Sequence, residues 1–193
     1  MPTRTTCPKC GAPLGPSLVR GEGPWNRQWR QGLKDDQQFI PRGGLEADVV
    51  CLCGTVVELQ YGHLSRLHIE QRERIYGAMV WLFYAVRAHH SGRLRLALTP
   101  GRQHVNFAWR SPRETLDVCQ RPVHLDLGAS DQANGRHLVL RLNRSYPEPN
   151  RLLGSGTLYT AEAFHNWMAH GIPLTPWIPD NSSESTTHDA EAA

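Results

Sequence analysis

The chain has 193 residues, of which 39% are hydrophobic and 20% are charged, and its formal net charge at pH 7 is +3. This length normally makes one domain. The chain contains no run of about 18 apolar residues, so we expect no membrane-spanning helix. Residues 1–7 lack the apolar stretch of a signal peptide, so we expect a cytoplasmic protein with no membrane partner.

Residues 1–21 are rich in Pro and Gly and contain Cys7 and Cys10, a C-x-x-C pair followed by Gly. Cys51 and Cys53 form a second, tighter pair farther along the chain. Four thiolates from two such pairs can hold a structural Zn²⁺ with no position left for a catalytic water. The alternative is that Cys51 and Cys53 are ordinary turn residues, which leaves Cys7 and Cys10 to other ligands or a redox role.

Residues 22–33 predict a helix with Trp25 and Trp29 on one face, four residues apart. Residues 34–44 are predicted to be a polar loop. Residues 48–60 then predict two short strands and a tight turn, because two pairs of valines flank Cys53-Gly54.

Polar side chains with metal-binding chemistry lie on this predicted hairpin. Glu58 and Gln60 are two residues apart, so they leave the same face of the strand, and the turn can bring Asp48 beside them. Carboxylate and amide oxygens are ligands that Mg²⁺ accepts, and such an ion can activate water next to a phosphate. The alternative is that Asp48 and Glu58 lie solvated on the polar face of an ordinary hairpin.

The rest of the chain predicts an alternation of helices and strands. Ser65 is a predicted N-cap for a helix over residues 66–76, and eight consecutive apolar residues at 79–86 predict a strand buried on both faces. Further strands are expected at 94–98, 105–109, 123–127 and 137–142, a short helix at 115–119 and a longer helix at 161–170.

The charge is unevenly distributed along the chain. Residues 180–193 contain four acidic residues and no Lys or Arg, which leaves 21 basic and 14 acidic residues, a net charge of +7, in residues 1–179. We expect residues 179–193 to be a disordered acidic tail. An Arg-rich body suits phosphate contacts, although an ordinary solvated surface has the same composition.

Several separated blocks between residues 22 and 168 carry a family resemblance. They are Ala47–Val49, Val57–Ser65, Ile69–Trp81, Phe107–Arg113, Cys119–Gly128, and Gly154-x-Gly156 before a helix with Phe164. In these blocks the chain resembles the CoiA-like family of competence proteins, which is assigned to the PD-(D/E)xK nuclease superfamily. The resemblance implies an α/β fold with a restriction-endonuclease-like mixed β-sheet core flanked by helices, over residues 22–178. The small zinc-stabilised arm of residues 1–21 would precede it.

The resemblance also implies roles for individual residues. Asp48, Glu58 and Gln60 match the superfamily's two catalytic acids and its lysine position, and Glu22 is the acidic candidate from the first helix. Gln60 departs from the superfamily pattern because Gln carries no charge. Asn26 is a second departure, at a position where the family has His.

We therefore expect a metal-dependent nuclease that cleaves DNA with Mg²⁺ or Mn²⁺ held by Asp48 and Glu58. Arg72 and His63 are candidates for substrate binding, although Arg72 could equally form a surface ion pair and His63 could be a plain loop residue. Competence or recombination proteins are partners that the resemblance implies, and a role in defence is an alternative. The rival hypothesis is a catalytically impaired, zinc-stabilised DNA-binding or adaptor protein on a nuclease fold. The sequence leaves open the form of DNA, single-stranded, duplex or branched, and the oligomeric state.

Overall fold

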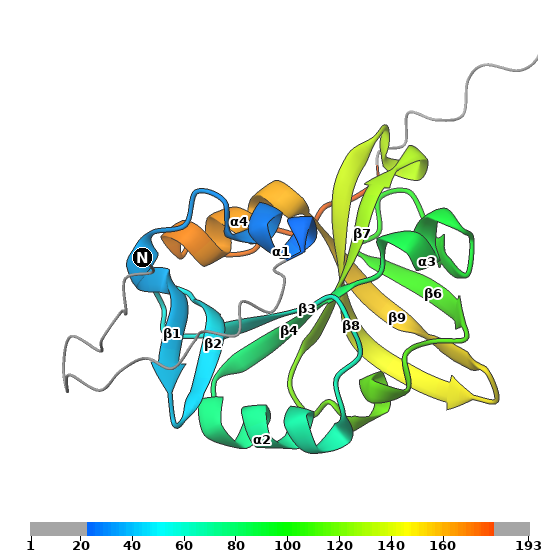
Figure 1. Cartoon of the computed structure of the whole chain (residues 1–193). Coiled ribbons are helices and arrows are strands. Elements are labelled where there is room, and N and C mark those ends of the chain that lie inside the picture. Colours follow the sequence, from blue (N-terminus) through cyan, green and yellow to red (C-terminus); the bar gives the residue numbers. More distant parts are fainter. Residues whose placement is uncertain (1–22, 180–193) are drawn as a thin grey trace, which may run out of the picture.

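The computed structural model describes residues 23–179, which form a nine-stranded mixed sheet with helices on both faces (Figure 1). The strands are β1 (Gln38–Arg42), β2 (Leu45–Val50), β3 (Val56–Gln60), β4 (Met79–Tyr84), β5 (Leu94–Ala97), β6 (His104–Arg110), β7 (Val123–Ser130), β8 (Arg136–Glu148) and β9 (Arg151–Thr160). The helices are α1 (Pro24–Arg30), α2 (Arg66–Tyr76), α3 (Val86–His90) and α4 (Ala161–His170), with short 3-10 turns η1 (Asp35–Gln37), η2 (Glu114–Val118) and η3 (Asp131–Ala133). The expected α/β class, with a mixed sheet flanked by helices, is confirmed. The expected zinc arm and almost all of the acidic tail lie outside the described residues.

The strand order in the sheet is β1-β2-β3-β4-β7-β8-β9-β6-β5. β4 runs parallel to both β3 and β7, whereas the other neighbouring strands are antiparallel. The chain thus passes from the β2–β3 hairpin through α2 and returns as β4 alongside β3. A helix is the usual way to join two parallel neighbours.

Local sequence explains the central elements. β4 reads Met-Val-Trp-Leu-Phe-Tyr and all but its last residue are buried, as expected for a parallel strand covered on both faces. The Ser65 side chain accepts a hydrogen bond from the backbone N–H of His68, so the predicted N-cap of α2 is confirmed. Among the described residues, no helix is long and apolar enough to cross a membrane.

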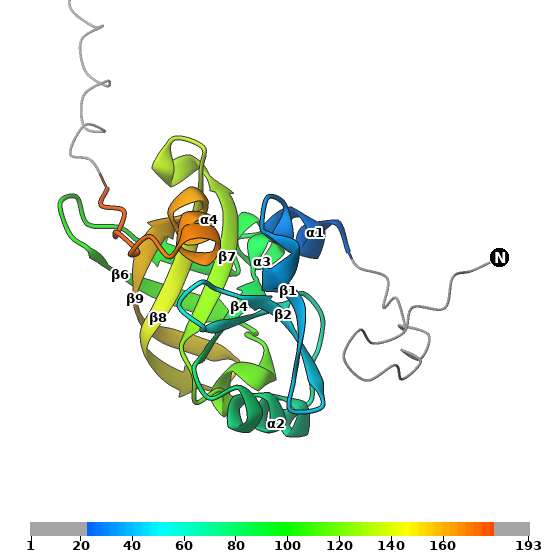
Figure 2. The same ribbon diagram turned by 90° about the vertical axis from the view of Figure 1, so that its left-hand side faces the viewer.

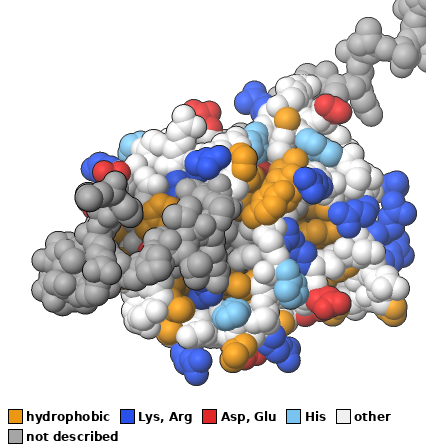
Figure 3. Space-filling model, in the orientation of Figure 1, with side chains coloured by type: hydrophobic (Ala, Val, Ile, Leu, Met, Phe, Trp, Pro, Cys, Tyr) orange, Lys and Arg blue, Asp and Glu red, His pale blue; other side chains and the backbone are white. Residues whose placement is uncertain are grey.

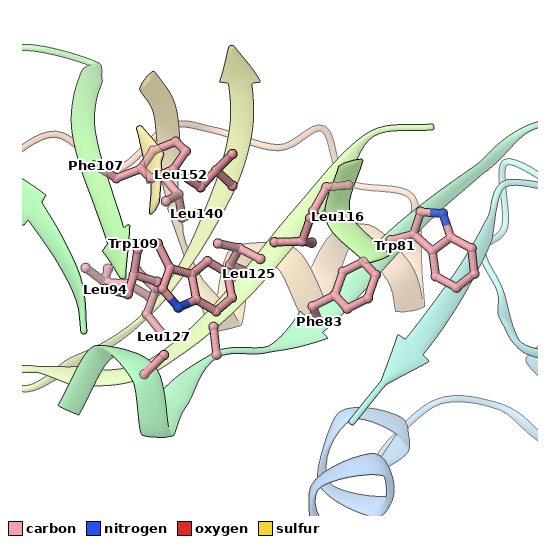
Figure 4. Packing of buried hydrophobic residues seen from close by; sticks show 14 of the residues in the cluster. Trp81, Phe83, Leu94, Phe107, Trp109, Leu116, Leu125, Leu127, Leu140 and Leu152 are labelled. Carbon is pink, nitrogen blue, oxygen red and sulfur yellow. The ribbon is translucent and has the colours of Figure 1, made fainter. Parts of the chain in front are cut away.

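Two apolar layers cover the sheet around the hairpin. α1 and α4 pack on one face through Trp25, Trp29, Phe164 and Met168, and α2 packs on the opposite face (Figures 1 and 2). The layer that includes α2 continues under the far half of the sheet. Figure 4 shows Phe107, Leu140 and Leu152 packed together there, and Trp109 beside Leu94 and Leu127.

Three sequence predictions were wrong in detail. Residues 34–44 are not a loop, because they contain η1 and the edge strand β1, in which Pro41 pairs with Glu46. An edge strand tolerates Pro, which lacks a ladder donor. The strand predicted over 79–86 ends at Tyr84, and Val86 begins α3.

The third error is that β9 was not predicted, because its two glycines weaken the strand pattern. A Cβ at Gly154 would lie 2.2 Å from the Arg144 carbonyl oxygen, and one at Gly156 would lie 2.4 Å from that of Arg141. Both glycines therefore let β9 approach β8 closely.

Candidate functional site

Asp48 of β2 and Glu58 of β3 lie beside each other across the hairpin. The antiparallel register pairs Val49 with Val57, so the next pair along the two strands is Asp48 and Glu58. Directly opposed side chains of an antiparallel pair leave the same face of the sheet. The turn that positions them is closed by hydrogen bonds between Cys51 and the residues at 54 and 55. The register thus brings the two predicted acids to neighbouring positions on the two strands.

The Asp48 carboxylate is held by the hairpin and by α1. Its Oδ2 accepts a 2.8 Å hydrogen bond from the backbone N–H of Leu59, and its Oδ1 lies 3.9 Å from a guanidinium nitrogen of Arg30. Burial raises the pKa of Asp48 above its ordinary value, although the Leu59 N–H and the charge of Arg30 act in the opposite direction. The side chain keeps 26% of its surface exposed, so Asp48 remains open to solvent.

Glu58 is only 3% exposed and carries one engaged and one unengaged oxygen. Its Oε2 accepts a 2.8 Å hydrogen bond from Arg72 Nε, whereas Oε1 has no hydrogen-bond partner among the described residues. Burial, and then the neighbouring charge of Asp48, raise the pKa of Glu58 to about 8, even though Arg72 lowers it. Burial and the nearby Glu58 also raise the pKa of the Tyr76 hydroxyl. Each of the two neighbouring acids thus lies beside a guanidinium, and the Glu58 Oε1 atom is left without a hydrogen-bond partner among the described residues.

The donor set fits a hard divalent ion only in part. Within residues 23–179, no group of three or more His, Cys, Asp and Glu side chains is placed to hold a metal. Asp48 and Glu58 would therefore supply two protein ligands. Mg²⁺ accepts this arrangement, because it usually keeps several waters and takes oxygens from substrate phosphates.

The other predicted site residues have different surroundings. Arg72 of α2 lies in the site through its ion pair with Glu58 and is 16% exposed. Gln60 is the last residue of β3, and its side chain donates a 2.8 Å hydrogen bond to the Gly62 carbonyl. His63 is exposed in the loop between β3 and α2. Glu22 lies outside the described residues.

Helix α1 reaches the hairpin through residues that the sequence analysis did not single out as ligands. The Asn26 side-chain amide donates a 3.2 Å hydrogen bond to the Leu59 carbonyl, next to Glu58. Arg30 contacts Asp48 one turn later and lies over the Phe39 ring. The residue that replaces the expected His thus contacts the backbone of the site.

The sequence analysis also missed Asp126 of β7, which is fully buried and binds α1 to the centre of the sheet. Its carboxylate accepts hydrogen bonds from the indole N–H groups of Trp25 and Trp29 and from the backbone of Gly128, and His137 Nε2 lies at hydrogen-bond distance, 2.6 Å, from its Oδ1. These donors hold the pKa of Asp126 below its usual value, although burial alone would raise it. Two buried tryptophans on one helix face were the only signal that a buried acceptor was needed.

Cys51 and Cys53 lie at the turn of the hairpin. Burial, followed by the nearness of Cys53, raises the pKa of the Cys51 thiol to about 12. Cys53 is exposed and its Sγ donates to the Thr55 hydroxyl at 3.3 Å. Although partial burial opposes it, the hydrogen bonds with Thr55 lower the pKa of Cys53. Cys7 and Cys10 lie outside the described residues.

Comparisons with known proteins add no relative. No protein-family model matches the chain. No curated protein and no solved structure matches it either.

Proposed function

We propose that this chain is a metal-dependent nuclease that cleaves DNA phosphodiester bonds at the β2–β3 hairpin. The observation that carries the proposal is the side-by-side placement of Asp48 and buried Glu58, with the Glu58 Oε1 atom unpaired among the described residues. Arg72 and Arg30 offset part of the charge of the two acids, and a divalent ion bound between the acids would also give the Glu58 Oε1 atom a partner.

Asp48 and Glu58 would hold Mg²⁺ or Mn²⁺, which when bound lowers the pKa of a water and neutralises charge on the scissile phosphate. Arg72 is the nearest described cation to Glu58, and its guanidinium can turn from the carboxylate to a phosphate oxygen. Gln60 follows Glu58 by two residues on the same face of β3, and its side-chain amide can position water or phosphate.

The order of elements supports the same proposal. After α1 and β1, the β2–β3 hairpin, α2 and the buried strand β4 follow one another, and β4 runs parallel to β3. Hairpin, helix and buried strand in this order are expected for a restriction-nuclease-like core. The resemblance to the CoiA-like family rests on this segment and on the later blocks Phe107–Arg113, Cys119–Gly128 and Gly154-x-Gly156 before the helix with Phe164. It suggests a role in DNA uptake, recombination or defence, in keeping with the cytoplasmic location expected from the sequence.

A structural zinc site is part of the proposal. Cys51 and Cys53 would bind Zn²⁺ together with Cys7 and Cys10, and so attach the N-terminal arm to the tip of the hairpin. Support comes from the turn geometry, which presents two neighbouring thiols, one of them exposed.

A second candidate function is DNA binding without catalysis. The observation in its favour is that one oxygen of each acid is already engaged, by Arg72 on Glu58 and by the Leu59 N–H on Asp48. The departure at Asn26 points in the same direction, whereas the presence of Asp48, Glu58 and Gln60 together argues for catalysis.

Cleavage assays distinguish the two functions. Single-stranded, duplex and branched DNA are incubated with Mg²⁺ or Mn²⁺ and with the wild type, Asp48→Asn, Glu58→Gln or the control Glu70→Gln, an exposed acid on α2. Nuclease function predicts that both hairpin variants lose at least about a thousandfold in rate, as for removal of central catalytic groups, while the control keeps it. Zinc content and thermal unfolding show that the variants are folded. Binding of DNA without cleavage by the wild type would instead assign the second function.

A further inference from the structure

A small pocket lies immediately beyond the end of β3. It has a volume of about 220 Å³, and the residues that define its chemistry are Tyr61, Tyr84, Arg87, Arg93, Trp109 and Arg113. Gln60 and Phe83 are partners in the parallel β3–β4 ladder, so Tyr61 and Tyr84 are the next residues on the two strands. The pocket therefore adjoins the hairpin that carries Asp48 and Glu58.

The charge of this pocket is positive and uncompensated. Three arginines line it, and no described Asp or Glu does. Arg113 is fixed in place, because its guanidinium donates to the carbonyls of Tyr61, Gly62 and Tyr84. Arg87 and Arg93 are exposed, and neither forms an ion pair within residues 23–179. Arg93 Nε donates a 3.4 Å hydrogen bond to the Ser91 hydroxyl, which leaves its two terminal nitrogens and the Arg87 guanidinium as donors for an anion.

Aromatic side chains form the other wall of the pocket. The Tyr61 and Tyr84 rings lie 4.6 Å apart between centroids, and Tyr61 is 41% exposed. Trp109 also lines the pocket, and its indole nitrogen is buried with no acceptor among the described residues. Near the middle of the face in Figure 3, hydrophobic side chains lie beside Lys or Arg side chains. Arginines next to an exposed ring are what a nucleotide requires, because the phosphate needs charge and the base needs a stacking surface.

We propose that this pocket binds the phosphorylated end of a nucleic-acid strand, an inference that rests on the proposed nuclease function. Arg87 and Arg93 contact the terminal phosphate, and the terminal base stacks on Tyr61. A terminal monoester carries close to two negative charges, whereas each phosphate within a strand carries one. Two exposed guanidinium groups, with the charge of Arg113 beside them, match the more highly charged group. The hairpin would then act on a strand whose end is held a short distance away.

The test compares one short single strand with a 5′-phosphate, a 3′-phosphate or hydroxyls at both ends, with a fluorophore at an internal base. Anisotropy is measured without added Mg²⁺ or Mn²⁺, so that cleavage does not interfere. The full-length wild type should bind one phosphorylated strand at least about tenfold more tightly than the unphosphorylated strand, since charge-assisted hydrogen bonds are strong. Arg87→Ala and Arg93→Ala should remove most of that preference. Arg136→Ala, which removes an exposed arginine of β8 outside the pocket, should keep it.

The proposal would be overturned if the wild type bound phosphorylated and unphosphorylated strands equally, or if the preference for phosphorylated strands survived in both pocket variants. It would also be overturned if a free nucleoside monophosphate bound as tightly as the phosphorylated strand, because the pocket would then be a mononucleotide site. The Glu58→Gln variant separates this proposal from the nuclease proposal, because it should keep the preference for phosphorylated ends. If the chain prefers phosphorylated ends but never cleaves DNA, the pocket proposal stands and the nuclease proposal is wrong.

Discussion

At the scale of single residues, Glu58 is subject to opposing charges. Burial, and then the charge of the neighbouring Asp48, raise its pKa, whereas Arg72 lowers it. Arg72 bonds one carboxylate oxygen and leaves the other without a partner among the described residues. The site therefore combines an anchored acid with an oxygen that can bind a ligand.

Arg72→Ala should slow DNA cleavage by about a hundredfold, because it removes the cation nearest to both Glu58 and the proposed phosphate position. Arg66→Ala is the matched control, since Arg66 lies on the same helix and forms an exposed i,i+4 pair with Glu70. Single-turnover rates at saturating metal give the comparison. Equal rates for Arg72→Ala and Arg66→Ala would remove Arg72 from the site.

His124 should make the stability of the fold depend on pH. Its ring is buried against Phe164, and burial, with a smaller effect of Arg141, lowers its pKa from 6.5 to about 3. The folded chain therefore binds the proton less readily than the unfolded chain, so stability is lost as the pH falls below 6.5 toward 3. Between pH 7 and pH 5 the loss from this residue should be about 2 kcal/mol.

Urea unfolding of the wild type and of His124→Leu at both pH values measures this contribution. The variant should show a smaller loss of stability on acidification, because it has no imidazole to protonate. The same loss in both proteins would show that other groups cause the pH dependence.

At the scale of elements, α1 is held in place by Asp126. Trp25 and Trp29 both donate to this one carboxylate, and the same helix carries Asn26 and Arg30 to the hairpin. The position of α1 at the site thus depends on a buried acid in a different part of the sheet.

Asp126→Asn should lower the free energy of unfolding by about 2–4 kcal/mol, because a neutral amide replaces the charged acceptor of several buried donors. Asp117→Asn removes an exposed acid and should change stability by less than about 0.5 kcal/mol. Denaturant unfolding checks both values. A loss for Asp126→Asn as small as that of the control would mean that α1 does not depend on this carboxylate.

An element could be predicted from the sequence when the residues that determine it lie within the element itself. The helices at 66–76 and 161–170 have their N-cap and apolar pattern within their own residues, and both begin and end as predicted. The Asp48–Glu58 pair follows from the two-residue period of a hairpin. Asp126 binds Trp29 and Trp25, which lie 97 and 101 positions away in the sequence, and no local pattern reveals such a contact. Strand β9 was missed because its glycines are explained only by the close approach of β8.

At the scale of the whole molecule, the two proposed metal sites share one hairpin. The turn carries Cys51 and Cys53, and the strands that leave it carry Asp48 and Glu58. A structural ion at the tip would stiffen the strands that hold the two acids. Zinc at the tip would thus give the proposed site the rigid support that a catalytic centre usually needs.

Cys53→Ser should lower the zinc content of the purified chain from about one ion to well below half, because a four-thiolate site tolerates the loss of a ligand poorly. Elemental analysis by mass spectrometry gives the stoichiometry. Cys119→Ser, which changes a cysteine between η2 and β7, should retain the zinc. A wild type without zinc, or full zinc in Cys53→Ser, would contradict the site.

The pairing of Asp48 and Glu58 as a metal centre is tested most directly by titrating the chain with Mn²⁺ and measuring free ion by electron paramagnetic resonance. This measurement does not depend on a substrate and is insensitive to traces of contaminating nuclease. We predict one Mn²⁺ site in the wild type and in Glu70→Gln, weakened by more than about tenfold, or about 1.4 kcal/mol, in Glu58→Gln. Equal Mn²⁺ affinity in the wild type and Glu58→Gln, or a wild type that binds no Mn²⁺, would contradict it.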